Sequence, residues 1–272
     1  MPPPIVQPIP DSYWRELPEK YDRTAVGAFV ELNNHFGRWQ PLPFYAHGLW
    51  GYTILRTVYT PESDALFPVA MERLKRLVHY WCHYTRFPAF GALCEEWRVD
   101  YAELNEELFR RCFLDVVEDR EGLAHLDSGG PDRFIALADY FRQWVAGINT
   151  GPRPDKEPRF SSCLVIDSES LASLMESDNE LPPLQCAATR KEKADVLRTG
   201  YPAWLWMIEA KYMTQPDERR DSYPGWLRVD PGYLHATWSS HLFLNDIDHW
   251  FCLGHKETPE GLGIYHHDPA GP

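Results

Sequence analysis

The stretch from Asn105 to Glu121 constrains the fold of this chain more than any other. It begins as a charged helical segment, continues as the short apolar strand Cys112 to Val117, and ends in four consecutive charged residues. Because a sheet holds the backbone still at the end of a strand, side chains placed there are well positioned to act on a ligand. The sequence therefore predicts a sheet with working polar side chains at a strand exit.

Segments of strand and helix character alternate along the chain. Residues 49–59 are rich in aromatic and β-branched side chains, which favours a strand, and residues 65–84 place apolar side chains at helical spacing. We expect the N-cap of this helix at Ser63 or Asp64. The further predictions are helices at 21–36, 101–111, 132–148, 167–175 and 232–244, and strands at 160–166, 201–212 and 224–229.

This order of elements predicts one α+β domain over residues 19–253. We expect a central mixed or antiparallel sheet of about five strands, with helices packed mainly on one face. Residues 1–18 carry six prolines and predict an extended arm, whereas residues 254–272 predict a flexible tail. A doubly wound parallel sheet is the alternative, but the sequence has neither the dinucleotide-binding nor the P-loop glycine pattern.

Composition narrows the class of function. The 272 residues carry a formal net charge of −13, which disfavours broad contact with a nucleic-acid backbone. A nucleic-acid partner would need a local basic patch, for which Arg73, Lys75 and Arg76, or Arg110 and Arg111, are the candidates. The six cysteines show no CxxC spacing, and no signal peptide or membrane span is visible, which predicts a reduced, cytoplasmic protein.

The strand exit carries the candidate catalytic group, namely Glu118, Asp119 and Glu121, with Asp115 inside the strand. Carboxylates packed within a few Å oppose one another's ionisation, so that one of them can hold a proton and act as an acid or a base. The same cluster suits a guanidinium or ammonium group. The alternative is a solvated turn that caps the next helix.

Aromatic side chains are abundant near the late strands, where Trp204, Trp206 and Trp226 either line a substrate pocket or pack in the core. A ring that faces solvent would be able to stack on an aromatic substrate or a cation. Asp167 and Glu169 follow the strand at 160–166, and we expect them to cap the next helix.

Other motifs point to chemistry less directly. Ser161, Ser162 and Cys163 stand at the start of a strand and are candidate nucleophiles, although no GxSxG elbow surrounds them. His79 and His83 are four residues apart on a predicted helix, as in a two-histidine metal site, but no third ligand follows at a diagnostic spacing. The sequence therefore predicts no metal site.

Several segments resemble a set of fungal proteins of unassigned activity. The resemblance lies between residues 49 and 230, in the pieces Trp50–Tyr59, Asn105–Leu108 with Arg110–Arg111, Val117–Glu121, Cys163–Asp167 and Pro224–Val229. This set is thought to include the arginine-containing cyclodipeptide synthases. Those enzymes take aminoacyl-tRNAs and join arginine to a second amino acid as a cyclic dipeptide.

The resemblance implies a cytoplasmic transferase whose partners are arginyl-tRNA and a second aminoacyl-tRNA. It implies no cofactor, because the aminoacyl ester is already activated. The family's acidic motif has the form D-D-x-x-E, and the nearest match here, Glu118 to Glu121, lacks the first Asp and differs in spacing. The implied roles are catalysis for Glu118, Asp119 and Glu121; substrate binding for Asp115, Trp204, Trp206 and Trp226; and tRNA binding for Arg73, Lys75 and Arg76.

Two other functions stay open. The first is a non-catalytic binding protein that holds a peptide or partner in an aromatic groove. The second is another small-molecule enzyme, such as a hydrolase that uses Ser161, Ser162 or Cys163.

Overall fold

The computed structural model describes residues 50–84, 109, 112–147, 158–176, 203–210, 212–214, 224–234 and 264–265. The predicted N-terminal arm, the helix at 21–36 and most of the predicted helices at 101–111 and 232–244 lie outside these ranges. The described strands form one sheet in the order β2-β1-β3-β4-β5-β6. They are β1 (Trp50–Arg56), β2 (Cys112–Val117), β3 (Ser162–Ile166), β4 (Leu205–Glu209), β5 (Trp226–Val229) and β6 (Ile264–Tyr265), the last of which lies within the predicted tail.

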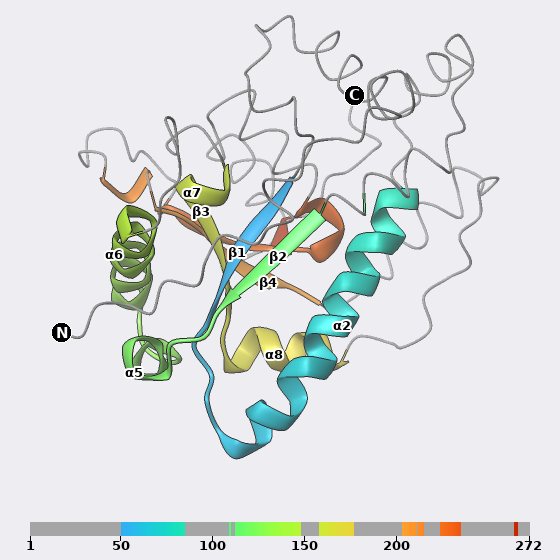
Figure 1. The fold of residues 1–272 in the computed structure, drawn as a ribbon, viewed down its shortest axis with the longest axis horizontal. Coiled ribbons are helices and arrows are strands. Elements are labelled where there is room, and N and C mark those ends of the chain that lie inside the picture. The colour runs from blue at the N-terminus through green and yellow to red at the C-terminus, as the bar shows by residue number, and fades with distance from the viewer. Residues whose placement is uncertain are drawn as a thin grey trace, which may run out of the picture.

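The described helices connect and cover these strands (Figure 1). The α-helices are α2 (Pro61–Tyr84), α5 (Arg120–Leu123), α6 (Asp132–Gly147), α7 (Pro158–Ser161) and α8 (Ser168–Glu176), and the short 3-10 helices are η4 (Ala124–Leu126), η6 (Tyr212–Thr214) and η8 (Pro231–Tyr233). Among the described residues, none of the helices combines the length and the apolar character needed to cross a membrane.

The sheet is mixed, as predicted for an α+β fold. β1 pairs in parallel with β2 and with β3, while β4 is antiparallel to both β3 and β5, and β6 is parallel to β5. Every described strand except β4 therefore runs in the same direction. The carboxyl ends of β1, β2 and β3 meet at one edge of the sheet, on the lower side in Figure 1, and we call this the carboxyl edge.

Helices lie on both faces of the sheet, where the sequence predicted them mainly on one. α2 and α8 pack with Tyr52 and Ile54 on one face, and α6 packs with Leu55 and Val165 on the other. The order β2-β1-β3 gives the reason. The chain moves from β1 to β2 in one direction and from β2 to β3 in the opposite one, and two right-handed crossovers in opposite directions place their helices on opposite faces.

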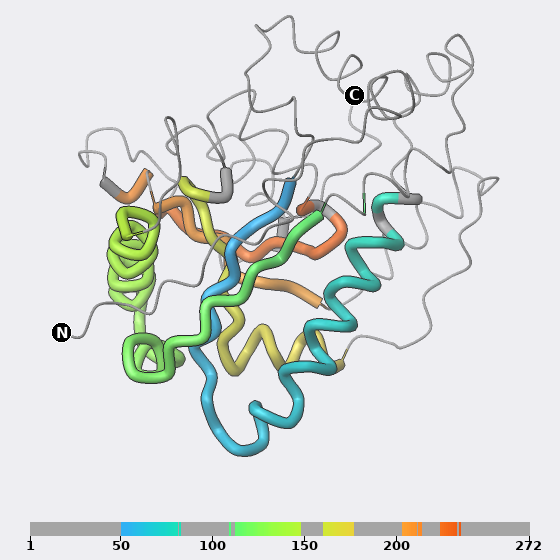
Figure 2. The backbone as a smooth tube through the Cα atoms, in the orientation of Figure 1, coloured from blue at the N-terminus to red at the C-terminus, as the bar shows by residue number. Residues whose placement is uncertain are grey.

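The first helix begins earlier than the sequence predicted. Figure 2 shows the backbone leaving β1, turning below the sheet and returning as α2. Thr60 is the N-cap: its hydroxyl accepts from the Ser63 amide at 3.1 Å, and the Ser63 hydroxyl accepts from the Thr60 amide at 2.8 Å. This is a reciprocal capping box, and Pro61 fits the first helical position because that amide needs no partner. The predicted N-cap at Ser63 or Asp64 was therefore wrong by three or four residues.

Candidate functional site

Each parallel strand of the β2-β1-β3 unit leads directly into a helix at the carboxyl edge. Thr60 caps α2, Asp119 caps α5 through the Gly122 amide at 3.0 Å, and Asp167 caps α8 through the Ser170 amide at 2.8 Å. These caps fix the chain where it leaves the sheet, so the polar side chains nearby have defined positions. The carboxyl edge thus brings together residues from distant parts of the sequence.

A buried arginine organises the edge beside β2. The Arg56 side chain is only 7% exposed; it donates to Glu118 Oε1 at 3.2 Å, to Val58 O at 3.0 Å and to Asp64 Oδ1. Its guanidinium also lies over the rings of Tyr59 and Phe67, with centroid distances of 4.7 and 4.3 Å. We call Arg56, Tyr59, Asp64, Glu118 and Arg120 the Arg56 cluster.

The acidic members of the Arg56 cluster face water. Asp64 is 40% exposed and Glu118 is 51% exposed. A second guanidinium, Arg120, donates to Asp64 Oδ2 at 2.7 Å while remaining 60% exposed, and it lies 5.2 Å from the Tyr59 ring centroid. The hydrogen bonds from Arg120 and Arg56 lower the pKa of the Asp64 carboxyl. Burial raises the pKa of the Tyr59 phenol to about 12, although nearby Arg56 opposes the shift.

The next two predicted acids have different surroundings. Asp119 Oδ2 accepts from the Tyr140 hydroxyl at 2.9 Å, and its other oxygen caps α5. Burial, followed by the hydrogen bond to Asp119, raises the pKa of Tyr140. Glu121 is exposed on the first turn of α5. Asp119 is therefore a structural anchor between α5 and α6, whereas Glu121 faces solvent.

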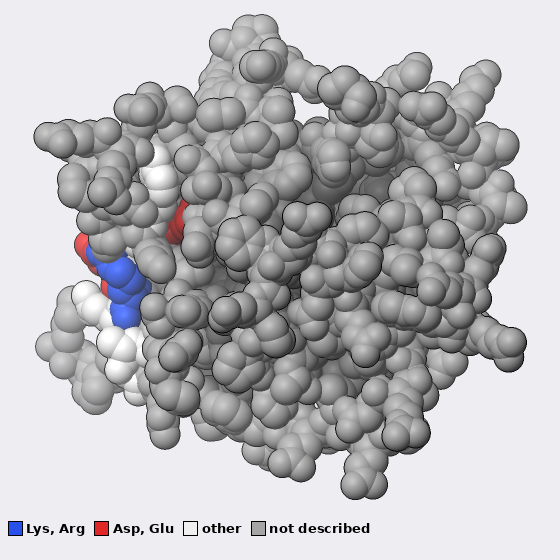
Figure 3. Space-filling view, turned by 90° about the horizontal axis from the view of Figure 1, so that it is seen from above, with Lys and Arg blue, Asp and Glu red and all other residues white. Residues whose placement is uncertain are grey.

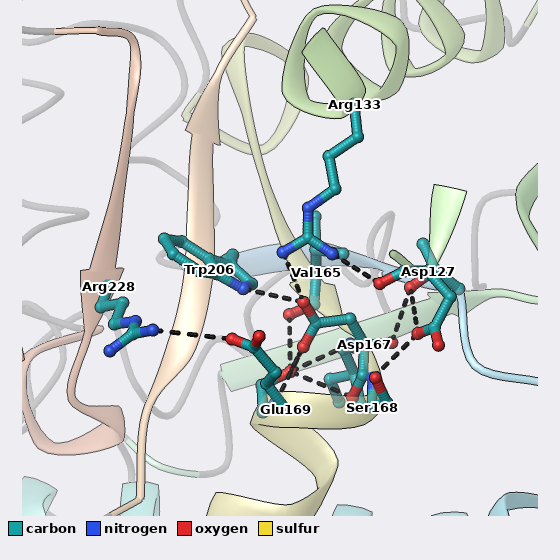
Figure 4. A network of polar contacts seen from close by, with 11 residues as sticks. Asp127, Arg133, Val165, Asp167, Ser168, Glu169, Trp206 and Arg228 are labelled. Atoms are coloured by element: carbon teal, nitrogen blue, oxygen red, sulfur yellow. Dashed lines mark hydrogen bonds and ion pairs between the residues drawn. The ribbon is translucent and has the colours of Figure 1, made fainter. Parts of the chain in front are cut away.

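A second network lies at the end of β3 (Figure 4). The Asp167 side chain is 1% exposed. One oxygen accepts from the Ser170 amide and hydroxyl at 2.8 and 2.7 Å, and the other accepts from Arg133 at 2.9 Å and from the Trp206 indole at 2.8 Å. We call Asp127, Arg133, Asp167, Ser170 and Trp206 the Asp167 network.

Asp127 links the segments that follow β1 and β3. Its Oδ1 accepts from the Thr57 hydroxyl at 3.3 Å and from the Ser168 amide at 2.8 Å, and its carbonyl accepts from Arg133. The connection that leaves β1 and the connection that leaves β3 run in opposite directions across the sheet, so the position between these two strands is a topological switch point. Open α/β sheets bind ligands at such points. Here an internal carboxylate occupies that position and ties β1, α6 and α8 together.

One arginine beside the Asp167 network is held mainly by aromatic rings. The Arg228 guanidinium lies 4.1 Å from the Trp204 ring centroid and 4.9 Å from that of Trp206. It forms an ion pair with Glu169, whose Oε2 lies 3.5 Å from Arg228 Nη2. Figure 4 shows Arg228 on β5 and Glu169 on α8 pointing toward each other.

The structure separates the predicted substrate-binding residues. Asp115 lies in the middle of β2, opposite Thr53, rather than at the carboxyl edge. Trp204 and Trp206 belong to the core on the α6 face, with 9% and 4% exposure, and Trp226 stacks on Phe134 with a centroid distance of 4.9 Å. Trp206 nevertheless reaches the site through its indole N–H.

The predicted basic strip on α2 is partly committed to the fold. Arg73 donates to the carbonyl of Leu174 at 3.2 Å and to that of Met175, near the end of α8. Lys75 pairs with Glu72 at 3.1 Å and is 49% exposed, and Arg76 is exposed. The alternative pair Arg110 and Arg111 lies outside the described residues.

The candidate nucleophiles lie at the amino end of β3, away from the carboxyl edge. Ser162 and Cys163 are fully buried, and burial raises the pKa of the Cys163 thiol. A neutral, inaccessible thiol is a poor nucleophile. His79 packs against Phe109 with a centroid distance of 4.3 Å, and among the described residues no group of three ligating side chains is placed to hold a metal.

The opposite end of the sheet offers little described surface. Figure 3 looks from above, and the charged side chains drawn there gather on the side where Figure 1 places α6, with acidic and basic groups next to each other. One such pair on α6 joins Arg142 to Asp139. The Arg56 cluster and the Asp167 network both lie at the carboxyl edge instead.

Sequence reasoning missed the basic half of the site. Arg56 ends an otherwise apolar strand, and a charge in that position was a usable signal. Arg133 and Asp127 had no such signal, because each is a polar residue in an ordinary turn or first helical turn. Their roles depend on contacts with residues far away in the sequence.

No protein-family model matches the chain, and a match was found neither among curated proteins nor among solved structures. The site is therefore interpreted from its own geometry.

Proposed function

We propose that the protein is an enzyme that acts on a small cationic substrate at the carboxyl edge. The supporting observation is the Arg56 cluster, in which half-exposed carboxylates surround a guanidinium. Among the described residues of this edge, carboxylates outnumber guanidiniums. The acids are Asp64, Glu118, Asp119, Glu121, Asp127, Asp167 and Glu169, and the arginines are Arg56, Arg120, Arg133 and Arg228.

The cluster is suited to a guanidinium for a geometric reason. Asp64 uses both oxygens on arginines, and Tyr59 supplies an aromatic face to Arg56 and to Arg120. A substrate guanidinium would meet the same carboxylate and ring that Arg120 meets now. Arg120 is 60% exposed and is held by a surface ion pair of small strength, so it is readily displaced.

The specific activity that we propose is tRNA-dependent synthesis of an arginine-containing cyclodipeptide. The resemblance of the segments between residues 49 and 230 supports it. In this reaction the α-amine of one aminoacyl-tRNA attacks the ester carbonyl of another and a peptide bond forms. The bond between the acyl carbon and the ribose oxygen breaks, and the first tRNA leaves as the alcohol, with the proton on its ribose oxygen. The second amine then attacks the remaining ester, closes the ring and releases the second tRNA.

In this proposal Glu118 accepts the proton of the attacking amine, because it is the most exposed carboxylate that contacts Arg56. Glu121 and Asp64 hold the substrate guanidinium, and Asp119 positions the α5 turn that carries Glu121. Exposed Lys75 and Arg76 are the residues left for tRNA contact on α2, since Arg73 bonds to α8.

The experiment is production of the full chain in a host, with arginine-containing diketopiperazines measured by mass spectrometry. We expect such a product from the parent and a loss of about 100-fold or more in Glu118→Gln. Glu72→Gln is the matched control, since Glu72 is another exposed, ion-paired glutamate, and it should keep full activity. The activity is refuted if purified protein with arginyl-tRNA and other aminoacyl-tRNAs gives no cyclic dipeptide, and the site is refuted if Glu118→Gln matches the parent.

A further inference from the structure

The four arginines at the carboxyl edge differ in how much of their hydrogen-bonding capacity is used. Arg56 bonds through three nitrogens, Arg133 bonds to Asp127 and Asp167, and Arg120 bonds to Asp64. The Arg228 guanidinium makes no hydrogen bond among the described contacts, and its buried Nε has no partner. Nε itself is shielded from solvent, but the side chain is 25% exposed, so its terminal nitrogens keep N–H donors that the oxygens of a ligand can accept.

Arg228 is nevertheless fixed in place. Two indole rings, Trp204 and Trp206, lie against its guanidinium, and the side chain is 25% exposed. A guanidinium that is already held flat loses little rotamer freedom when it binds a planar anion through its fork. Trp206 is itself anchored by its bond to Asp167, so the platform is rigid.

Glu169 faces Arg228 as a loose partner. The two charges are 3.5 Å apart, and Glu169 is 60% exposed. An exposed ion pair of this kind contributes little, so both groups are available to a ligand that carries the complementary charges. The pair thus presents one fixed cation and one movable anion to solvent.

The surrounding charge selects the kind of ligand. Asp167 lies beside this pair with 1% exposure, and its charge is balanced by Arg133 rather than by Arg228. A phosphate dianion would bring two negative charges next to Glu169 and meet, among the described residues, one guanidinium that has spare donors, that of Arg228. A carboxylate brings one, and an ammonium group on the same molecule would pair with Glu169.

We propose that Arg228 and Glu169 form a binding site for a free α-amino acid, with the carboxylate on Arg228 and the ammonium on Glu169. The site does not depend on the cyclodipeptide proposal. In an aminoacyl-tRNA the carboxyl group is esterified, so the ligand of this site is a separate molecule from the reacting aminoacyl group.

The test is calorimetric titration of the full chain with each common L-amino acid. The methyl ester and the N-acetyl derivative of the tightest binder are then titrated. The ester lacks the carboxylate charge, and the N-acetyl derivative lacks the ammonium charge. We expect saturable binding, weakened about tenfold or more by either derivative. Inorganic phosphate should bind more weakly than the amino acid.

Two variants assign the binding to the proposed pair. Arg228→Lys keeps the charge but loses the fork, and it should weaken binding about tenfold. Arg142→Lys makes the same exchange at a partly exposed, ion-paired arginine on α6, outside both sites, and should leave binding unchanged. Glu169→Gln should weaken binding of the amino acid about fivefold but leave binding of the N-acetyl derivative unchanged.

Several outcomes would overturn the proposal. They are the absence of saturable binding by any amino acid at millimolar concentration, equal binding of the methyl ester, tighter binding of phosphate, and wild-type affinity in Arg228→Lys. Circular dichroism of each variant shows whether it is folded, and Glu169→Gln changes an exposed side chain, so it tests the site even if Arg228→Lys misfolds.

Discussion

The Arg56 cluster, at the ends of β1 and β2, and the Asp167 network, at the end of β3, combine acids and arginines in opposite arrangements. In the Asp167 network the acid is buried, with 1% exposure, and its partner Arg133 is 10% exposed. In the Arg56 cluster the base is buried, with 7% exposure, while Asp64 and Glu118 are 40% and 51% exposed. An ion pair that is buried on both sides is a structural element, whereas acids that open to water around a buried base remain available to a ligand.

The sharpest way to break this comparison is Asp167→Ala. We expect a loss of about 3–5 kcal/mol in the free energy of unfolding, because Arg133 would remain buried without its carboxylate and the Trp206 indole and the Ser170 amide would lose their acceptor. Urea denaturation measures the change. Asp167→Asn, which keeps a cap acceptor, should lose less, and a loss below about 1 kcal/mol in Asp167→Ala would contradict the assignment.

Arg56→Met tests the reverse case. Methionine keeps much of the apolar stem but removes three hydrogen-bonding nitrogens, and we expect a loss of about 2 kcal/mol. The loss should be smaller than for Asp167→Ala, since the acids left behind are exposed and return to water. The same denaturation measurement decides this order, and an equal or larger loss would remove the distinction between the two regions.

The Asp167 network was only partly predictable from the sequence. The pattern Asp167-Ser-Glu-Ser170 predicted a helix cap, and the structure confirms the Asp167 cap: Asp167 Oδ1 accepts from the Ser170 amide, and the Ser170 hydroxyl accepts in return from the Asp167 amide. β2 lies where it was expected, whereas β3 begins at Ser162, two residues later than predicted, because Phe160 and Ser161 belong to α7. The partners of Asp167 were not expected, because Arg133 and Trp206 are 34 and 39 positions away and no local pattern encodes such pairings.

For the tryptophans, core packing was the favoured interpretation and a pocket the alternative, and Trp204 and Trp206 are buried. The sequence did not show which face of the sheet they would occupy, because that depends on where a helix covers the sheet. That choice followed from the strand order β2-β1-β3, which placed α6 over Trp204 and Trp206. The acidic residues after β2 were visible in the sequence, but the buried arginine between them was missed.

A third test extends the comparison to alkaline pH. The pKa of Tyr59 is raised to about 12 in the folded chain from 10 in the unfolded chain, so folding favours the protonated phenol. The stabilisation from this group is fully present below pH 10 and is lost as the pH rises toward 12. We expect about 1 kcal/mol, less than the full shift implies because the half-buried ring is partly screened by solvent.

Tyr59→Phe isolates this contribution. Unfolding free energies of the variant and the parent at a series of pH values from 9 to 12 should show a smaller alkaline loss in the variant. The other tyrosines and lysines titrate in both proteins and cancel in the difference. Parallel curves across this range would exclude a raised phenol pKa.

The smallest stability effect should come from Glu118→Gln. Glu118 is half exposed and contacts Arg56 through one oxygen at 3.2 Å, so we expect a change below about 0.5 kcal/mol. Thermal unfolding monitored by circular dichroism is sufficient to detect a larger one. A near-zero change, together with the loss of product expected above, would separate function from stability at this position, and a loss of 2 kcal/mol would make Glu118 a structural residue.

The position of β1 has a consequence for synthesis on the ribosome. All seven of its residues are buried, and it pairs with β2 and β3. Thr57, just after β1, bonds to Ile166, which is translated 109 residues later. At ordinary elongation rates this delay is roughly 5 to 20 seconds. During that interval the nascent strand has an open edge, so the period of greatest aggregation risk is determined by the pace of translation rather than by the stability of the finished fold.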